Sequence, residues 1–591
     1  MHKVEIYARK LLIWRAQRLS NKQFLYLIAL AIGIFSALAV VVLKNGVRLV
    51  QNALLNNIES PRDIQYFALP LIGIFLTLIV IKFLIRKPVD HGIPNALHAI
   101  SKNNGNIERY SIWSSVVAAI ITVGFGGSAG LEGPAVGSTS GIASTIGQWL
   151  KQNHKTKIIL IGCAASASLG AIFNAPIAAI IFAVEVMMID LTATSLIPLL
   201  IASLGATVTS RFFLGTETLF KFSLVDPFNS VDIPFYILLG LLSGLISVYF
   251  NKIYFQVASI SERISNVWLR ALAAGSLLGI LVYLFPHLYG EGYDLINGLI
   301  QDDIDPFKNG LWFISTESSS LIVLILIGLA LAKALAASFT IKGGGFAGIF
   351  APALFIGSTV GYSFATLGNS LNMNLSVRNF TLVAMCGVMA GVLHAPLTAI
   401  FLIAEVSGGY ELFIPLMIVS SISFITAKYF SPTNIYTRQL SQRGELLTHH
   451  KDQAVLTLMT LKDEIELNFE VIHPYDSLGD LVSAISKNSR NIFPVVDEEG
   501  LFLGVVNLND VRQVMFETDK YESTLVHDYM TAAPEQIYLS DNMEKVMQKF
   551  DSSHAWNLPV LTESAKYLGF VSKSKLFTAY RKHLQEFYDI S

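Results

Sequence analysis

The sequence predicts an all-α polytopic membrane domain, built from two inverted repeats with broken and re-entrant helices, and a C-terminal α/β domain. Three observations predict this fold class. The 591 residues are 53% hydrophobic and 14% charged, whereas soluble chains carry about 25% charged residues. Apolar runs of about 17 to 25 residues, long enough to cross a bilayer, recur as far as Phe430 and then stop. Two motifs rich in glycine or proline each occur twice, in the same order.

The N-terminal residues 1–22 are predicted to be a cytoplasmic segment, with both termini of the chain in the cytoplasm. Basic side chains in this segment are typical of the cytoplasmic side of a membrane, and no small-residue cleavage site follows them. The net charge of -1 gives no indication of a nucleic-acid partner. Cys163 and Cys386 lie far apart in apolar segments, so neither a disulfide framework nor a metal site is expected.

Residues 23–430 are predicted to form the membrane domain, with repeat halves of about 23–213 and 232–430. Several of its apolar runs are interrupted by Gly or Pro, or are too short to cross alone. Such broken helices occur where the backbone lines a polar cavity, because backbone exposed to lipid cannot stay unsatisfied. The predicted helical runs are 24–47, 66–85, 113–123, 157–188, 195–213, 234–257, 269–285, 320–339, 349–367, 382–406 and 412–430.

An internal repeat is visible in two pairs of segments. The glycine-rich segment 125–134 matches 343–352, and the Ala-Pro segment 174–186 matches 394–406. Order and separation are preserved, which indicates two homologous halves. Corresponding Gly- and Pro-interrupted segments in such halves point to a central binding site.

The two glycine-rich segments each lead into an apolar helix, and one of them carries an acid, Glu132. Free backbone amides and the positive end of the helix dipole form an anion site. Close helix packing is the alternative role for such glycines, but two corresponding segments favour the anion site. A carboxylate at this depth costs about 2.5 to 3.5 kcal/mol. Glu132 is therefore interpreted as a helix cap that competes with the anion, and such a cap is a gate.

These motifs together resemble those of the CLC family of chloride channels and proton/chloride exchangers. The segment 130–134, Gly-Leu-Glu-Gly-Pro, resembles the gating-glutamate motif of the family. The segment 348–352, Gly-Ile-Phe-Ala-Pro, matches its second anion-site motif, and 92–94, Gly-Ile-Pro, matches the end of its first. Tyr436 lies where the family has an ion-coordinating tyrosine. The resemblance implies a homodimer in the lipid bilayer, with one chloride pathway per subunit, gated by Glu132, and no required cofactor.

The resemblance also implies which residues hold chloride, the bound substrate. The expected set is His91, Gly92, Ile93, Ile349, Phe350 and Tyr436. Tyr436 has an alternative role as an interfacial aromatic anchor. His91 replaces a serine of the family pattern, and its imidazole would make conduction pH-sensitive or alter anion preference unless it points away from the anion. Equal halide flux in His91→Ser and in the wild type from about pH 5 to pH 8 would contradict this hypothesis.

Val186 bears on the coupling of chloride to protons. Family exchangers commonly have an inner proton-accepting glutamate at this position, after the acid that is Glu185 here. Valine cannot carry a proton, which predicts a passive chloride channel. A proton-coupled antiporter is the alternative, because Glu185 is adjacent and some exchangers lack the inner acid. A structural role for Glu185 is open too, since its repeat mate Glu405 has the same Glu-Val context.

The C-terminal domain resembles a pair of CBS domains. A linker at 431–455 is expected to precede CBS domains at 456–520 and 521–588. The strand motifs 492–496 and 557–561 are each followed by a segment that ends at the family's ribose-binding aspartate position. Asp510 fits this position, whereas the second unit has Lys575, which would attract a phosphate as a point charge. An adenine-nucleotide sensor and a purely structural or dimerising tail are both open.

Other classes of membrane protein are less compatible with the sequence. No His-Glu-x-x-His run and no Gly-x-x-x-x-Gly-Lys-Ser/Thr motif occurs, so neither an intramembrane metalloprotease nor an ATP-driven pump is expected. The chain is predicted not to be an enzyme. A membrane nucleotide sensor without transport is the remaining alternative, and the plasma or bacterial inner membrane is the expected location.

Overall fold

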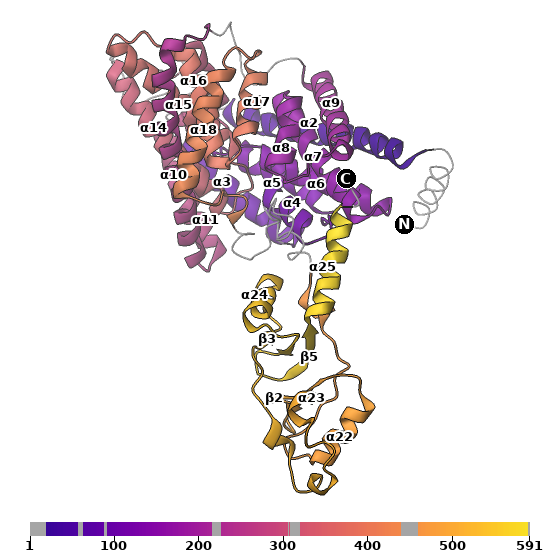
Figure 1. The fold of residues 1–591 in the computed structure, drawn as a ribbon. Coiled ribbons are helices and arrows are strands. Elements are labelled where there is room, and N and C mark those ends of the chain that lie inside the picture. Colours follow the sequence, from indigo (N-terminus) through magenta and orange to yellow (C-terminus); the bar gives the residue numbers. More distant parts are fainter. Residues whose placement is uncertain are drawn as a thin grey trace. The chain divides into compact units, whose positions relative to one another are not determined.

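The computed structural model describes residues 19–56, 63–87, 92–215, 226–304, 307, 319–438 and 459–588. The chain divides into two compact units, Met1–Gln442 and Arg443–Ser591 (Figure 1). Each unit has its own secondary-structure type, and each is described separately below.

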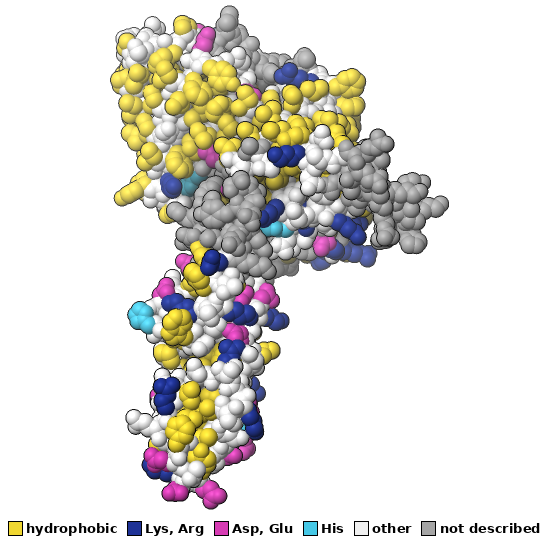
Figure 2. Space-filling view, turned by 45° about the vertical axis from the view of Figure 1, so that its right-hand side comes forward, with side chains coloured by type: hydrophobic (Ala, Val, Ile, Leu, Met, Phe, Trp, Pro, Cys, Tyr) yellow, Lys and Arg dark blue, Asp and Glu magenta, His cyan; other side chains and the backbone are white. Residues whose placement is uncertain are grey.

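The described part of the first unit is helical. Nine of its helices are long and apolar enough to cross a membrane. Figure 2 shows hydrophobic side chains over much of the face of this unit that it presents. The helices of the first half are α2 (Asn21–Leu55), α3 (Gln65–Ile79), the π-helix η1 (Val80–Ile85), α4 (Gly92–Ser101), α5 (Ser111–Gly124), α6 (Glu132–Trp149), α7 (His154–Phe173), α8 (Pro176–Glu185) and α9 (Ala193–Leu214). Those of the second half are η2 (Ser230–Asp232), α10 (Ile233–Arg263), α11 (Val267–Leu284), η3 (Pro286–Leu288), α12 (Tyr293–Gln301), α14 (Ser319–Lys342), α15 (Phe350–Ser370), α16 (Val377–Leu393), α17 (Pro396–Val406) and α18 (Phe413–Phe430).

The repeat predicted from the sequence also appears in where the helices break. The apolar runs 157–188 and 382–406 are each two helices in the structure, α7 with α8 and α16 with α17. Asn174 and His394 end the first helix of each pair in the left-handed conformation, with φ of 62° and 56°. A proline then opens the second helix of each pair. The breaks are therefore built by the Asn-Ala-Pro and His-Ala-Pro sequences themselves.

Three further helices, α4, α6 and α12, are absent from the predicted runs. Helix α6 is rich in Gly, Ser and Thr, and most of its residues are buried among other helices. A helix that is surrounded by protein needs no continuous apolar surface toward lipid, so hydropathy does not reveal it. The small side chains instead let its neighbours approach closely.

The second unit is an α/β structure in which two small sheets are surrounded by helices. Its strands are β1 (Ile492–Val496), β2 (Phe502–Asn507), β3 (Ile537–Tyr538), β4 (Asn557–Leu561) and β5 (Tyr567–Ser572). Strands β1 and β2 pair antiparallel, with Ile492 opposite Asn507, and the second sheet has the order β3-β4-β5. The helices are α21 (Leu461–Glu464), α22 (Leu478–Lys487), α23 (Leu508–Val511), η4 (Thr518–Lys520), η5 (Val526–Tyr529), α24 (Met543–Ser553) and α25 (Lys573–Tyr588).

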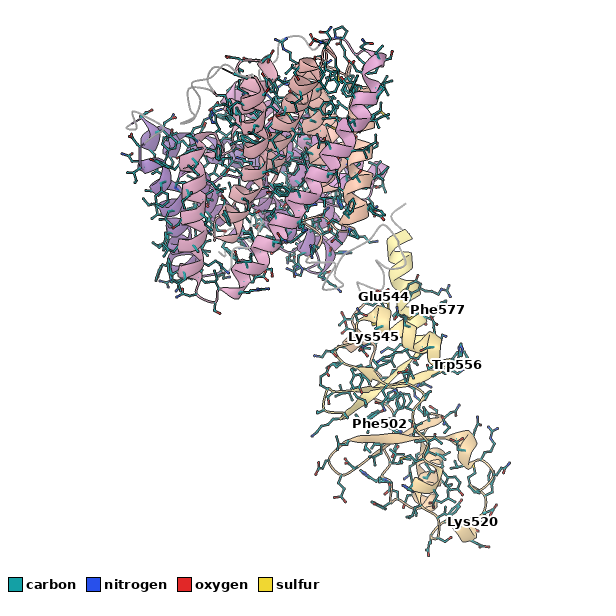
Figure 3. All side chains as sticks on the ribbon, turned by 90° about the vertical axis from the view of Figure 1, so that its left-hand side faces the viewer. Phe502, Lys520, Glu544, Lys545, Trp556 and Phe577 are labelled. Atoms are coloured by element: carbon teal, nitrogen blue, oxygen red, sulfur yellow. The ribbon has the colours of Figure 1, made fainter. Side chains whose placement is uncertain are left out.

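The two halves of this unit share a small hydrophobic core around Phe469, Val505 and Phe570. Phe502 stacks on Tyr567, with ring centroids 6.1 Å apart, and Figure 3 shows Phe502 on the strand of the first half. Charged side chains are spread over the surface of this unit in Figure 2, as expected of a domain in water.

Candidate anion site

The two glycine-rich segments meet each other in space. Gly130 and Gly348 form an antiparallel bridge, in which the N–H of each donates to the carbonyl of the other at 2.9 and 2.7 Å. Helices α6 and α15 begin two residues further on, at Glu132 and Phe350. The N-termini of both helices, one from each repeat, are thereby held at one place in the membrane unit.

The carboxylate of Glu132 occupies this place. Its Oε1 accepts a hydrogen bond from the backbone N–H of Phe350 at 2.6 Å, across the repeat. The residue is 1% exposed, and Oε2 has no hydrogen-bond partner among the described residues. One carboxylate oxygen thus occupies the amide end of α15, where an anion would bind, and the other is unpaired.

Gly348 is needed for this arrangement. A Cβ at this position would lie 2.3 Å from Oε1 of Glu132 and 2.8 Å from the backbone N of Gly133. Any side chain would therefore displace the carboxylate or the turn that precedes α6. This explains physically why the second anion motif begins with a glycine.

A cavity of about 200 Å³ reaches the same turns. Its lining includes Gly133, Gly348, Ile349 and Tyr436, together with Gly92 and Ile93 at the start of α4. The hydroxyl of Tyr436 is buried and has no hydrogen-bond partner among the described residues. A buried donor that faces a cavity without a protein partner is a group that an anion could satisfy.

Most of the expected chloride-binding residues therefore lie together. Gly92, Ile93, Ile349 and Tyr436 line the cavity, and the amide of Phe350 binds the gate carboxylate instead. The burial of Tyr436, which is 6% exposed, favours a place in the anion site over an interfacial anchor. His91 lies outside the described residues.

The cavity also contains charged groups that the sequence did not single out. Lys342, Arg438 and Glu262 contribute to its lining. The ammonium of Lys342 lies 4.6 Å from the ring centroid of Tyr254, and the guanidinium of Arg438 lies 3.9 Å from that of Phe255. The two cations outnumber the single acid Glu262, so these side chains leave the lining net positive, which attracts anions.

Val186 is 3% exposed and follows directly on α8, and it is not among the residues that line the cavity. Its neighbour Glu185 accepts hydrogen bonds from the N–H of Leu397 at 3.1 Å and of Thr398 at 2.7 Å, at the start of α17. The threonine hydroxyl also donates to it at 2.7 Å. Glu185 therefore caps a helix of the other repeat.

Glu405 makes the matching contact in the opposite direction. Its carboxylate accepts the N–H groups of Ile177 and Ala178, at 3.0 and 2.7 Å, at the start of α8. The reciprocal pair is what a two-fold relation between the repeats produces. It gives both glutamates a structural role, one of the interpretations that the sequence left open for Glu185.

Sequence reasoning missed a buried lysine close to the gate. Lys333, on α14, is 0% exposed, and its Nζ donates to Ser128 Oγ at 2.9 Å and to the carbonyl of Gly290 at 3.1 Å. Its ammonium also lies 4.7 Å from the ring centroid of Phe355. The signal was present, because a single lysine interrupts the apolar run 320–339.

In the second unit, the two aspartate positions of the CBS motifs differ. The carboxylate of Asp510 accepts hydrogen bonds from the backbone N–H of Asn507 at 3.2 Å and from its Nδ2 at 3.1 Å. Lys575 lies 3.9 Å from a carboxylate oxygen of Glu464 and donates to the carbonyl of Asp463. Lys575, at the second position, thus binds the acidic end of helix α21.

Close to this second position, Glu466 binds two partners. Ser572 Oγ donates to its Oε1 at 2.5 Å, and a guanidinium nitrogen of Arg490 donates to its Oε2 at 2.6 Å. Partial burial acts to raise the pKa of Glu466, but the hydrogen bonds from Ser572 and Arg490 and the Arg490 charge hold that pKa below its ordinary value. Glu466 is therefore ionised at neutral pH and links the two halves of this unit.

Comparison with known families gives matches in both units. Residues 71–428 match the model of the family described as voltage gated chloride channel. Residues 463–517 and 526–582 match the CBS domain.

Individual proteins agree with these matches. A putative chloride channel protein ClcB-like from Ralstonia nicotianae is 25% identical over 432 residues, which is 71% of this chain and 97% of that protein. The H(+)/Cl(-) exchange transporter ClcA of Vibrio campbellii is 29% identical over 321 residues, which is 53% of this chain and 65% of the exchanger. A crystal structure of a slow cyanobacterial Cl-/H+ antiporter superposes with a TM-score of 0.61 at 22% identity, over 72% of this chain and 98% of that one.

Proposed function

We propose that this chain, which belongs to the voltage gated chloride channel family, exchanges chloride for protons across its membrane. Membership of the CLC family makes it an anion transporter and an integral membrane protein. The sequence predicted a passive channel with the antiporter as the alternative. We adopt the antiporter, because a relative that is 29% identical is named an exchanger and because the gate carboxylate takes the place of an anion.

The observation that carries the proposal is the hydrogen bond from the Phe350 amide to the Glu132 carboxylate. An ionised carboxylate is held there by the amide and by the dipole of α15. When Glu132 takes up a proton, its charge is lost and this attraction weakens. Chloride can then occupy the amides, and deprotonated Glu132 returns when the chloride has left. Proton binding and chloride binding at one position alternate in this scheme, which couples them.

The proposed chloride site uses the cavity beside the gate. The N-terminal residues Gly92 and Ile93 of α4, together with Ile349 and the Tyr436 hydroxyl, would bind the dehydrated ion. We include His91 in this site on the family pattern alone. We propose a homodimer on the family pattern alone. Because Glu132, Phe350 and Tyr436 all belong to one chain, each subunit would have a complete pathway.

Val186 restricts how protons reach the gate from the inner side. It cannot carry a proton, and Glu185 is occupied by the amides of α17. An exchanger with this sequence needs water or another acid for its inner proton path. A passive channel is the second candidate function, and Val186 is the observation that favours it.

Flux measurements on liposomes containing the purified protein distinguish the two functions. Chloride efflux and extravesicular pH are recorded in the same run. The exchanger takes up protons against their gradient when chloride leaves, and Glu132→Gln abolishes this uptake while chloride still passes. Glu411→Gln is the matched control, because Glu411 is an exposed glutamate of the same unit and should leave both fluxes unchanged. Chloride efflux without proton movement in the wild type would show a channel instead.

We further propose that the CBS pair regulates transport, with Asp510 as the ribose acceptor of an adenine nucleotide. The exposed carboxylate of Asp510 supports this, whereas Lys575 in the second position does not. Isothermal titration with ATP and AMP tests it directly. Binding that is lost in Asp510→Asn supports a sensor, and no binding in the wild type supports a structural tail.

A further inference from the structure

A second cavity, of about 230 Å³, adjoins the anion cavity. Ala258, Glu262, Ile341 and Lys342 line both cavities, whereas Arg270 lines the second one and not the first. The second cavity is surrounded by α3 with η1, α10, α11 and α14. Helix α11 packs against α3 and α14, and α14 packs against α10 (Figure 1). It is therefore a space between packed helices, beside the proposed chloride pathway.

Two cations in the second cavity lack a carboxylate partner. The Nε of Arg270 is buried and has no hydrogen-bond partner among the described residues. Within that part of the chain, neither Arg270 nor Lys342 makes an ion pair, although Glu262 lines the same cavity. A buried cationic donor without an acceptor costs free energy, so an anion from outside the chain can satisfy it. The two cations exceed the one acid by a single charge, which fits a ligand with one negative charge.

The second cavity lies where membrane-spanning helices end. The helices η1, α10 and α11 belong to three spans that are long and apolar enough to cross a membrane. Each contributes a lining residue within about one turn of its end: Ile81 in η1, Glu262 in α10 and Arg270 in α11. Because the ends of such spans meet the membrane surface, the cavity lies at the level of the lipid headgroups.

The surface beside the second cavity is typical of a lipid–water boundary. The ammonium of Lys82, on η1, lies 5.2 Å from the ring centroid of Trp268 on α11, and Trp and Lys are common anchors at that boundary. Phe83 and Leu84 on η1 and Leu269 on α11 are exposed. A free phosphate ion gains nothing from these apolar side chains, whereas the acyl chains of a phospholipid bury them. The surroundings therefore favour a lipid over a soluble anion.

We propose that the second cavity binds the phosphate of an anionic phospholipid from the surrounding membrane. The Nε–H of Arg270 and the ammonium of Lys342 donate to the phosphate oxygens, as arginine and lysine do in other phosphate sites. The negative charge of the phosphodiester balances the excess cation of the lining. The acyl chains lie along the exposed apolar side chains of η1 and α11. This site is independent of whether the protein exchanges chloride for protons or conducts it passively.

Native mass spectrometry of the purified full-length protein in detergent tests the site. Dioleoylphosphatidylglycerol is compared with dioleoylphosphatidylcholine, which has the same acyl chains and no net charge. The wild type should bind the phosphatidylglycerol more tightly. Its affinity should fall by roughly ten- to a hundredfold in Arg270→Gln and in Lys342→Gln, since a hydrogen bond to a charged group contributes about that factor.

Arg263→Gln is the matched control, because Arg263 is an exposed cation at the end of α10 that does not line the second cavity. It should bind phosphatidylglycerol as the wild type does. The melting temperature of each variant without added lipid shows whether it is folded. Equal affinity in the wild type and in folded Arg270→Gln would overturn the proposal. An equal loss in Arg263→Gln would also overturn it, because general surface charge would then explain the binding.

Inorganic phosphate distinguishes the two sources of a phosphate group. In isothermal titration in detergent, it should not bind the wild type measurably, because it lacks acyl chains. Binding of inorganic phosphate that is lost in Arg270→Gln, without binding of phosphatidylglycerol, would show a site for a soluble anion and overturn the lipid site. Tighter binding of phosphatidylcholine than of phosphatidylglycerol would overturn the preference for an anionic headgroup.

Discussion

At the scale of single residues, the two carboxylate oxygens of Glu132 differ in their hydrogen bonds, and the gate depends on this difference. Oε1 accepts the Phe350 amide, whereas Oε2 is buried without a hydrogen-bond partner among the described residues. A buried, unpaired carboxylate oxygen costs free energy. The bound state is therefore held by few contacts, and a competing anion or a proton can release it.

Tyr436 offers a test of the anion site at this scale. Removing its hydroxyl in Tyr436→Phe deletes a hydrogen bond to a charged group, which is worth about 1.5 to 3 kcal/mol. We expect chloride affinity to fall by roughly ten- to a hundredfold, measured by isothermal titration in detergent. Tyr249→Phe is the control, because that hydroxyl donates to the carbonyl of Leu331 away from the cavity. Unchanged affinity in Tyr436→Phe would remove this residue from the site.

At the scale of elements, the site is built by pairing the N-termini of α6 and α15. The Gly130–Gly348 bridge fixes this pairing, and a Cβ at Gly348 would overlap the gate carboxylate. Gly348→Ala should therefore displace Glu132 and let chloride pass without proton uptake, or lower the yield of folded protein. Gly328→Ala is the matched control, because a Cβ there meets nothing within 4 Å. Coupled transport that survives in Gly348→Ala would contradict this account.

A second prediction at the scale of elements concerns the helix caps formed by Glu185 and Glu405. Glu405 binds the first amides of α8, and hydrogen bonds to a charged group are worth about 1.5 to 3 kcal/mol. Glu405→Ala should lower the free energy of unfolding by about this amount, seen as a lower melting temperature in detergent. The exposed Glu411→Ala should melt as the wild type does. Equal melting temperatures for the two variants would show that the cap contributes nothing.

At the scale of the whole molecule, the chain joins a membrane unit to an α/β unit in water, and pH acts on the latter through Glu466. The pKa of Glu466 lies below its ordinary value of 4.5, since the Ser572 and Arg490 hydrogen bonds outweigh its partial burial. Its contribution to stability is therefore complete above pH 4.5 and is lost as the pH falls through the lower folded pKa.

We expect Glu466→Gln to destabilise the second unit at neutral pH by about 1 to 2 kcal/mol, since the pair with Arg490 is partly exposed. The variant should also lose part of the acid sensitivity of the wild type. Hydrogen exchange of the β4 and β5 amides in the full-length protein, measured from neutral to acidic pH, reports both effects. The exposed Glu498→Gln serves as the control. Identical pH profiles for Glu466→Gln and the wild type would contradict the role of this carboxylate.

The sequence by itself determined the membrane and α/β units, the internal repeat, the glycine turns and Glu132 as the acid in one of them. These features are local, because hydropathy, proline and glycine act on neighbouring residues. The helix breaks at Asn174 and His394 are also set by the local sequence. Hydropathy alone does not reveal them, because the helices on either side of each break form one apolar run.

Only the tertiary structure decided which groups meet. The bond from Phe350 to Glu132 and the cap of Glu185 on α17 join residues from different repeats, and no periodicity encodes such contacts. The same holds for Lys333 and Glu291, which are single charges from distant segments that pack at one loop. The free energy of burying a charge depends on the partners that the fold supplies, and these become known only when the helices have packed.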